Sequence, residues 1–217
     1  MIQSEFKNII TSLKEALTHE LPGENAHRIM IPHGRDLYPA IDNNTIKQSS
    51  VLILLFPFNG KVSTCLIRRP STMRNHGGQI AFPGGRFEAF DEDLLHTALR
   101  ESFEEIGTDS NQIEIIGALT PLYVQVSNFT INPFIGWSHT VPQFITDDCE
   151  VDEIFTISIE RLLHHTSKQL REVTTIHGTF EVPGFYIDNL FIWGATAMII
   201  SEFDEIIKAL LVVKSPR

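Results

Sequence analysis

"GGRFEAFDEDLLHTALRESFEEIGT", residues 84–108, joins a glycine pair to a helical pattern that ends in a cluster of glutamates. The pattern predicts a helix over residues 91–106. Asp91 is suited to the N-cap position, because a short acidic side chain accepts hydrogen bonds from the free N–H groups at a helix start. Gly107 is suited to end the helix, since glycine adopts the left-handed conformation that follows the last turn.

Three glutamates of this helix share one sector. Glu101, Glu104 and Glu105 have spacings i, i+3 and i+4, which place them within about 100° of one another. The sector lies beside an apolar face that we expect to pack on a sheet, made of Leu95, Leu99, Ser102, Phe103 and Ile106. Clustered carboxylates bind hard cations such as Mg²⁺. The alternative is a solvated acidic face on which Arg100 pairs with Glu104, and the helix alone supports both interpretations.

A basic and glycine-rich stretch comes directly before the helix. "RRPSTMRNHGG" (68–78) has three arginines and no acid in a chain of net charge −10, and "GGQIAFPGG" (77–85) follows with two glycine pairs. Guanidinium groups and the backbone N–H groups of glycine-rich loops both bind phosphate oxygens. The succession of basic loop, glycine loop and acidic helix indicates a metal-bound ligand that carries phosphate.

The composition limits the other classes of partner. The chain has 217 residues, of which 42% are hydrophobic, which suits one globular domain with a sizeable core. Its acidic balance argues against nucleic acid or an anionic membrane as the main partner. The two cysteines form no metal-binding spacing and suit a reducing compartment. We find no signal-peptide pattern and expect a cytoplasmic protein.

The remaining pattern predicts a mixed α/β (α+β) fold. A helix is expected over residues 1–20, a connector over 21–47, and a hairpin of 50–58 with 61–69 around Asn59-Gly60, a pair typical of tight turns. Further strands are expected in 113–126, 128–139 and 173–194, and a strand leading into a helix in 150–165. Residues 189–200 suit a buried strand or helix, and 201–213 a closing helix. Strands interleaved with helices indicate a mixed sheet flanked by helices.

The glutamate helix resembles the sequence box of Nudix hydrolases, G-x5-E-x7-R-E-U-x-E-E-x-G-U, where U is a bulky apolar residue. Arg100-Glu101, Glu104-Glu105 and Gly107 stand in register, and Glu92 stands eight positions before Arg100. Gly85 is one residue too far from Glu92, which we interpret as a single insertion. Ser102 and Thr108 replace bulky apolar residues.

The flanking sequence is similar to the coenzyme A pyrophosphatase branch of that family, with its pattern L-L-T-x-R-[SA]-x3-R-x3-G-x3-F-P-G-G. The chain reads "CLIRRPSTMRNHGGQIAFPGG", and the later "WGATA" (193–197) is also typical of the branch. Cys65, Ile67 and Pro70 depart from the pattern, and these departures concern the identity of the substrate. The resemblance extends over about residues 50–203, so we expect a Nudix fold, with a mixed sheet sandwiched between helices.

The resemblance implies metal-dependent hydrolysis of a nucleoside diphosphate derivative with Mg²⁺ or Mn²⁺. Glu101 and Glu105 would be the principal metal ligands, Glu104 a third ligand or a base acting through water, and Arg100 the residue that orients the glutamates. The substrate-binding residues would be Arg69, Arg74, Gly84 and Gly85. The expected substrate is coenzyme A or a derivative, cleaved to 4′-phosphopantetheine and adenosine 3′,5′-bisphosphate.

A further glutamate from a later loop completes the site in many Nudix enzymes. "DDCEVDEIF" (147–155) offers Glu150 and Glu153, and the branch pattern favours Glu150. A solvated acidic loop is the alternative for both residues.

Three alternatives remain open from the sequence. The substrate is coenzyme A, or it is ADP-ribose, a dinucleotide or a nucleoside triphosphate, or the chain is a non-catalytic nucleotide sensor on the same fold. We divide the chain into an N-terminal helix and connector packed on the domain (1–47) and a Nudix hydrolase domain (48–217). The apolar stripe of the first helix packs on its own domain or on a second copy in a homodimer.

Overall fold

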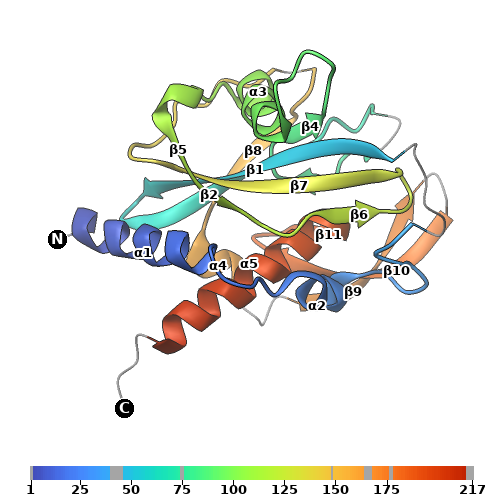
Figure 1. Cartoon of the computed structure of the whole chain (residues 1–217). Helices are drawn as coiled ribbons and strands as arrows, with labels where there is room; N and C mark the ends of the chain where they lie inside the picture. The colour runs from blue at the N-terminus through green and yellow to red at the C-terminus, as the bar shows by residue number, and fades with distance from the viewer. Residues whose placement is uncertain are drawn as a thin grey trace.

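The structure is a computed structural model of the chain and describes residues 2–39, 46–73, 76–147, 149–163, 168–175 and 178–213. Within these ranges, eight strands form the main sheet (Figure 1). Its central strands β1 (Lys47–Phe58) and β7 (Phe129–Ser138) run parallel, while the other pairs are antiparallel. The other strands are β2 (Lys61–Arg68), β3 (Ile80–Ala81), β4 (Gly84–Arg86), β5 (Ile113–Ala118), β6 (Leu122–Val124) and β8 (Glu153–Ser158).

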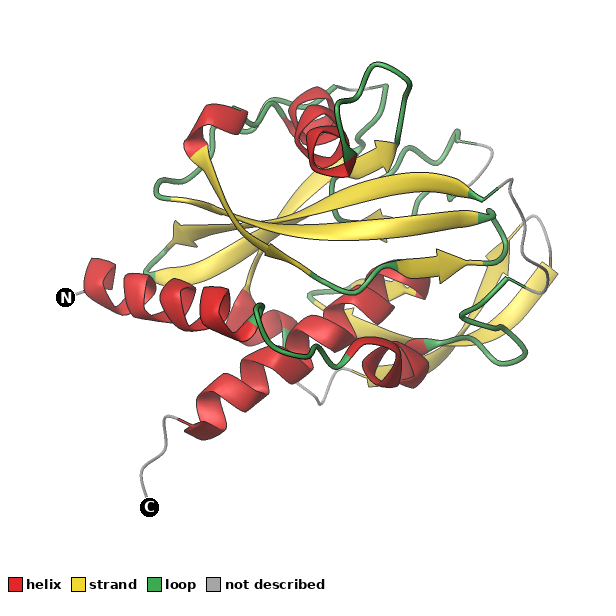
Figure 2. Cartoon of the chain, viewed as in Figure 1, coloured by secondary structure: helices red, strands yellow, loops and turns green. Residues whose placement is uncertain are grey.

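Helices cover both faces of this sheet (Figure 2). Helix α3 (Leu94–Ile106) covers one face, and α1 (Ile2–Ala16) and α5 (Gly194–Val213) cover the other. The predicted mixed sheet between helices is confirmed. The buried run of β1 follows from this arrangement, because a strand covered on both faces is apolar at successive positions. Leu52 and Leu54 pack under α3, whereas Ile53 and Leu55 belong to the larger core on the opposite face.

A second, antiparallel sheet lies against α5 and η1. It consists of β9 (Lys168–Thr175), β10 (Gly178–Ile187) and β11 (Leu190–Trp193). The short helical segments of the chain are α2 (Gly23–His27), η1 (Arg28–Met30), η2 (Ser110–Gln112) and α4 (Ile159–Leu162).

Most expected elements are confirmed, with shifted ends. The hairpin β1–β2 turns at Asn59 and Gly60, whose φ angles are 48° and 73°. The connector 21–47 contains α2 and η1, which its proline and glycine content did not predict. The closing helix begins at Gly194 rather than at residue 201, so residues 189–200 contain the whole of strand β11 followed by the first turns of the helix.

The start of α3 corrects the predicted N-cap. Asp93 occupies that position, and its side chain accepts a hydrogen bond from the His96 backbone N–H. Asp91 lies two residues earlier and has a different role, described below. Gly107 ends the helix as predicted, with φ 73°.

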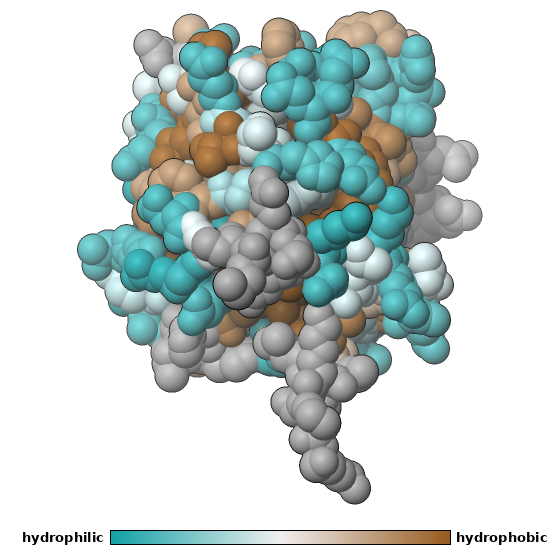
Figure 3. Space-filling view, turned by 90° about the vertical axis from the view of Figure 1, so that its left-hand side faces the viewer, coloured by the Kyte–Doolittle hydropathy of each residue, from teal (hydrophilic) through white to brown (hydrophobic). Residues whose placement is uncertain are grey.

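The surface mixes polar and apolar side chains. Figure 3 shows the face on the α1 side, where teal and brown residues are interspersed. Within the described part of the chain, no helix is both long and apolar enough to cross a lipid bilayer.

Candidate active site

Glu105 is the buried centre of the site. It lies on the face of α3 that packs on the sheet, and its side chain is 2% exposed. One carboxylate oxygen accepts a hydrogen bond of 2.7 Å from the Gly84 backbone N–H, and the other lies 3.5 Å from Arg69 Nη2. Burial raises the pKa of Glu105 to about 8, although Arg69 and the Gly84 N–H oppose the shift. Arg69 and the Gly84 N–H therefore compensate only part of the cost of burying the negative charge of Glu105.

Glu101 lies one turn earlier, next to the backbone of Gly85. Its side chain is 16% exposed and forms an ion pair of 2.9 Å with Arg100 Nη2. Burial raises the pKa of Glu101, and the nearby Arg100 reduces that shift. A Cβ atom on Gly85 would come within 2.2 Å of the Glu101 carboxylate oxygen. Glycine at position 85 is thus what allows this carboxylate to approach β4.

Gly84 has a second steric role. Its φ of 150° is rarely adopted by other residues, and a Cβ atom there would lie 2.2 Å from the Ser50 carbonyl oxygen in β1. Its carbonyl oxygen accepts a hydrogen bond of 2.7 Å from Arg69 Nη2. Gly84 therefore joins Arg69, β1 and the glutamate helix at one point.

Arg100 is held in place by Asp91, the residue that the sequence predicted as the N-cap of the helix. Its Nε and Nη2 atoms donate to the two carboxylate oxygens of Asp91 at 2.8 and 3.0 Å. The Asp91 side chain is fully buried and also accepts hydrogen bonds from Thr97 Oγ1 and the Glu88 N–H. The Arg100 guanidinium, followed by these donors, holds the pKa of Asp91 well below its usual range.

The pairing also corrects the position of the insertion in the box. Glu92, predicted to stand in register with Arg100, is exposed. Asp91 stands six positions after Gly85, which is the spacing of the box with aspartate in place of glutamate. The additional residue therefore falls between Asp91 and Arg100. The spacing from Gly85 was a signal in the sequence that could have identified Asp91.

The three glutamates predicted to share one sector of the helix differ in how far they are buried. Glu104 is 46% exposed and accepts a hydrogen bond of 2.8 Å from Arg100 Nη1, so the surface pair considered for this helix is present. Phe103, expected on the packing face, is 61% exposed, and this prediction was wrong. Glu105 is buried instead, because the face of α3 that meets the sheet lies nearer the acidic sector than the apolar pattern indicated.

Glu150 lies in the loop before β8 and is exposed. Its charge makes a small contribution to raising the pKa of both Glu101 and Glu105, after the larger effect of burial. Glu153, the other candidate, lies 3.6 Å from Arg68 Nε in an ion pair. Arg74, a predicted substrate-binding residue, lies outside the described residues.

The donor set fits a hard divalent cation. Glu101 and Glu105 offer poorly solvated carboxylates that repel one another, and a metal ion relieves such repulsion. In the arrangement shown, the described residues include no group of three or more His, Cys, Asp or Glu side chains able to hold a metal ion. Glu104 is paired with Arg100, which leaves Glu101 and Glu105 as the two glutamates of the helix that could hold a cation.

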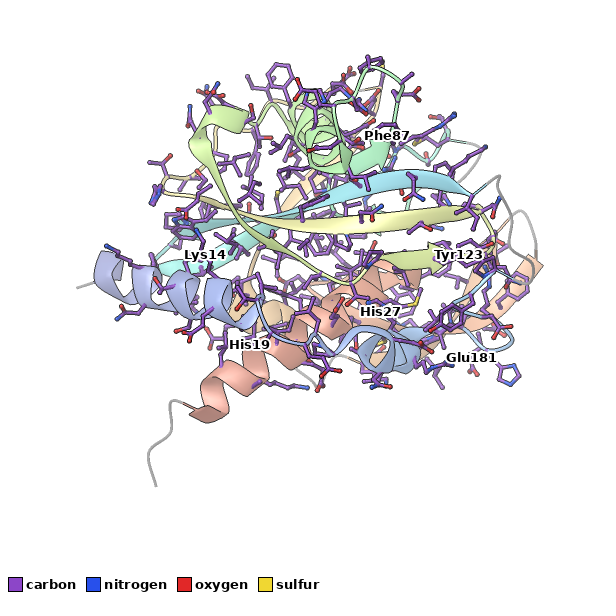
Figure 4. The ribbon with its side chains drawn as sticks, viewed as in Figure 1. Lys14, His19, His27, Phe87, Tyr123 and Glu181 are labelled. Atoms are coloured by element: carbon purple, nitrogen blue, oxygen red, sulfur yellow. The ribbon has the colours of Figure 1, made fainter. Side chains whose placement is uncertain are left out.

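A cavity of about 910 Å³ opens beside these residues. Arg69, Gly84 and Gly85 line its wall next to the glutamates, and Tyr123, labelled in Figure 4, lines it from β6. Trp193, the first residue of the branch-typical stretch 193–197, is half-buried and lines the cavity as well. The volume is at the upper end of the range typical of small-molecule sites.

Comparison with known proteins identifies the class. The family model described as the NUDIX domain matches residues 46–175. The chain belongs to the Nudix hydrolase family, whose members generally use divalent metal ions such as Mg²⁺ or Mn²⁺.

Several relatives agree with this family. "Uncharacterized Nudix hydrolase NudL" of Photorhabdus laumondii is 30% identical over 161 residues, which cover 74% of this chain and 84% of that protein. "Nudix hydrolase 3" of Caenorhabditis elegans is 34% identical over 125 residues, 56% of this chain. The match spans about half of the C. elegans protein, 52% of its length. A solved Nudix hydrolase from M. smegmatis, RenU, shares the fold with a TM-score of 0.52 at 11% identity, covering 79% of this chain and 90% of that one.

Replacing Gly85 by alanine tests the close approach of β4 to α3. The added methyl group overlaps the Glu101 carboxylate, so that side chain must move while the surrounding fold is kept. We expect kcat to fall about 10²-fold, since a small displacement of a catalytic group has effects of that size. Steady-state kinetics and the thermal midpoint measure the two effects. Gly60→Ala, whose Cβ meets nothing within 4 Å and which lies in the β1–β2 turn, is the control for adding a methyl group to a glycine away from the glutamates. Unchanged kcat in the Gly85 variant would contradict a role of the Glu101 carboxylate in the reaction.

Proposed function

We propose that this protein is a coenzyme A diphosphatase, which hydrolyses the diphosphate bond of coenzyme A or a derivative to 4′-phosphopantetheine and adenosine 3′,5′-bisphosphate. The observation that carries the proposal is the contact of Arg69 with Gly84 and Glu105 at the cavity wall. Arg69 and Gly84 belong to the branch pattern, and Glu105 to the Nudix box. The two sequence signatures therefore meet in one site.

The chain's own residues suit hydrolysis of a diphosphate. Glu101 and Glu105 would hold Mg²⁺ or Mn²⁺, which neutralises charge on the phosphate oxygens when bound. Arg69, at the cavity wall, is placed to bind a phosphate oxygen, and we propose the same for Arg74. Asp91 fixes Arg100, and Arg100 in turn orients Glu101. We assign the base that activates water to Glu150, with Glu104 as the alternative.

The cavity favours a large substrate. Its walls extend from the glycine pair to the start of α5, so a diphosphate at Gly84 and Gly85 would leave room for a nucleoside on one side. Extra cations in this cavity suit a substrate with phosphate beyond the diphosphate, as coenzyme A has on its ribose.

Product analysis by mass spectrometry tests the proposal. The full chain is incubated with coenzyme A and millimolar Mg²⁺ or Mn²⁺, and in parallel with ADP-ribose and a dinucleotide. We expect adenosine 3′,5′-bisphosphate and 4′-phosphopantetheine from coenzyme A, and loss of both products with EDTA. Hydrolysis of ADP-ribose or the dinucleotide alone would assign another substrate and reject the coenzyme A proposal. Metal-independent binding without hydrolysis would indicate a sensor.

Three further proposals concern the whole chain. We propose the division into an N-terminal helix and connector (1–47) and a hydrolase domain (48–217), a cytoplasmic location, and a homodimer as the assembly to be tested. Phe6, Ile10 and Leu13 of α1 lie in the larger core, which supports packing of the first helix on its own domain.

A further inference from the structure

The cavity beside the glycine pair has walls from outside the family-matched span. The segment after η1 contributes residues 31, 32 and 35–37, and the end of β11 with the start of α5 contributes residues 193–196, 198 and 199. The NUDIX match covers residues 46–175, so both walls lie outside it. Figure 1 shows the blue chain after α2 running below β6, toward the second sheet. Residues 193–197 of the α5 wall belong to the branch pattern, whereas the loop after η1 lies outside both the NUDIX match and the branch resemblance.

The described lining of this cavity is basic, although the chain as a whole is acidic. Its cations are Arg35, Lys47, Arg69 and Arg86, and its carboxylate is the exposed Asp36. Arg69 contacts Glu105, and Arg86 lies 3.8 Å from Glu88. The other two cations, Arg35 and Lys47, form no ion pair with a carboxylate among the described residues.

Arg35 is one of these cations. It is half-buried, and none of the ion pairs among the described residues includes it. Burial lowers the pKa of Arg35, with no carboxylate to oppose the shift. A guanidinium that loses water without gaining a protein partner is suited to bind an anion.

The loop that carries Arg35 is held in place on both sides. Met30 before it and Leu37 after it are buried in the larger core, and the Arg35 N–H donates to the Pro32 carbonyl oxygen at 3.2 Å. Tyr38 OH donates to Glu24 in α2. The position of Arg35 at the cavity is therefore set before any ligand binds.

Helix α2 is itself anchored by a buried glutamate. Glu202 of α5 is fully buried and lies 3.0 Å from His27 Nε2, and it accepts hydrogen bonds from the Gly23 N–H and from Thr120 Oγ1. Figure 4 labels His27 where α2 meets α5. This contact fixes the loop after η1 relative to the α5 wall of the cavity.

Lys47 is the second cation. It begins β1 at the cavity, its ammonium group lies 5.6 Å from the centre of the Phe129 ring, and no described carboxylate pairs with it. Arg35 and Lys47 come from different segments and line the same cavity as the glycine pair.

We propose that Arg35 and Lys47 form a second anion site in this cavity, which binds a phosphate monoester of the substrate separately from the diphosphate at Gly84 and Gly85. The inference rests on the proposed function for the identity of that group, the 3′-phosphate on the ribose of coenzyme A. Arg35 is then a specificity-determining residue supplied by the N-terminal segment.

Calorimetric binding of two nucleotides to the full chain with Mg²⁺ tests the site without requiring turnover. Adenosine 3′,5′-bisphosphate and adenosine 5′-monophosphate differ only in the 3′-phosphate. We expect the wild type to bind the bisphosphate about tenfold more tightly or better, as one charge-assisted contact implies. Arg35→Gln reduces the preference to within about twofold, and Arg35→Lys keeps part of it. Arg28→Gln, an exposed arginine paired with Glu24, leaves the preference unchanged.

The outcomes separate this site from the proposed function. Equal binding of the two nucleotides by the wild type, or equal weakening of both in Arg35→Gln, would overturn the second anion site. Kinetics with coenzyme A and 3′-dephospho-coenzyme A form the second arm, in which Arg35→Gln raises KM about tenfold for the former alone. An Arg35-dependent preference in a chain that hydrolyses neither compound supports the anion site and rejects the coenzyme A proposal.

Discussion

Replacing Glu105 by glutamine is expected to lower kcat about 10³-fold, because loss of the metal ligand that we propose at this position removes several kcal/mol of transition-state stabilisation. The same change is expected to raise the thermal midpoint of the metal-free protein at pH 8. Glutamine has nearly the same shape, accepts a hydrogen bond from the Gly84 N–H and carries no charge into a site that is 2% exposed. Steady-state kinetics and thermal unfolding in EDTA measure the two effects.

The pH dependence of stability follows from the raised pKa of Glu105. Its ordinary value is 4.5 and its value in the fold is about 8, so the folded state holds the proton more strongly than the unfolded state. The contribution to stability is full below pH 4.5, decreases as the pH rises toward 8, and is lost above it. The advantage of Glu105→Gln over the metal-free wild type should therefore increase from pH 5 to pH 8.

Glu92→Gln is the matched control for Glu105→Gln. Glu92 is exposed and lies just before the start of α3, whereas Glu105 lies near the end of that helix. Its replacement should therefore change neither the thermal midpoint nor kcat. A metal-free Glu105→Gln variant that is less stable than the wild type at pH 8 would show that the carboxylate is already compensated, and would contradict the metal assignment.

Replacing Asp91 by asparagine is expected to lower the free energy of unfolding by about 3 kcal/mol, since removing one partner of a buried ion pair leaves the other charge uncompensated. Asp91 is fully buried and Arg100 is 14% exposed. We also expect a loss of about 10- to 100-fold in kcat/KM, because an outer residue that orients a metal ligand has effects of that size. Urea unfolding at pH 7 measures the stability.

Acid should remove the difference between Asp91→Asn and the wild type. The pKa of Asp91 is held below its usual range, so its contribution to stability is fully present above about pH 4 and decreases progressively as the pH falls from there toward the lowered pKa of the folded state. Glu92→Gln again serves as the control, with a change within about 0.5 kcal/mol. If Glu92→Gln destabilised the protein as much as Asp91→Asn, the pairing of Arg100 with Asp91 would be wrong.

Local signals in the sequence predicted the local structure well. Asn59-Gly60 predicted the hairpin, and Gly107 predicted the end of α3, because each needs a positive φ that few other residues adopt. The two glycines of β4 were predicted as part of a glycine-rich loop suited to bind phosphate oxygens. The structure shows that each also permits a close contact, of Gly84 with Ser50 and of Gly85 with Glu101.

The orientation of α3 could not be predicted in the same way. A helical wheel gives the angle between two side chains but not the direction of the sheet. Phe103 was therefore expected to be buried, and Glu105 takes that position with its carboxylate held by the Gly84 N–H. A functional carboxylate placed at a packed surface violates the apolar pattern from which the face was inferred.

Long-range partners left no signal in the sequence. Arg35 meets the cavity from a connector, and Glu202 meets His27 across 175 positions of the chain. No fixed spacing in the sequence predicts either contact, because both depend on how the segments before β1 and after β11 pack on the sheet. The roles of the site residues remain proposals, whereas their placement is described by the structure.

The contact of Glu202 with His27, Gly23 and Thr120 has a consequence for the folding unit. Three segments far apart in the chain share one buried carboxylate, and two of them lie outside residues 46–175. The span matched by the family model is therefore shorter than the span that this buried carboxylate holds together. We expect local opening of α2 to release the Arg35 loop and to uncover the Glu202 carboxylate beneath α5 in the same event, which would couple the ligand cavity to the packing of α2 on α5.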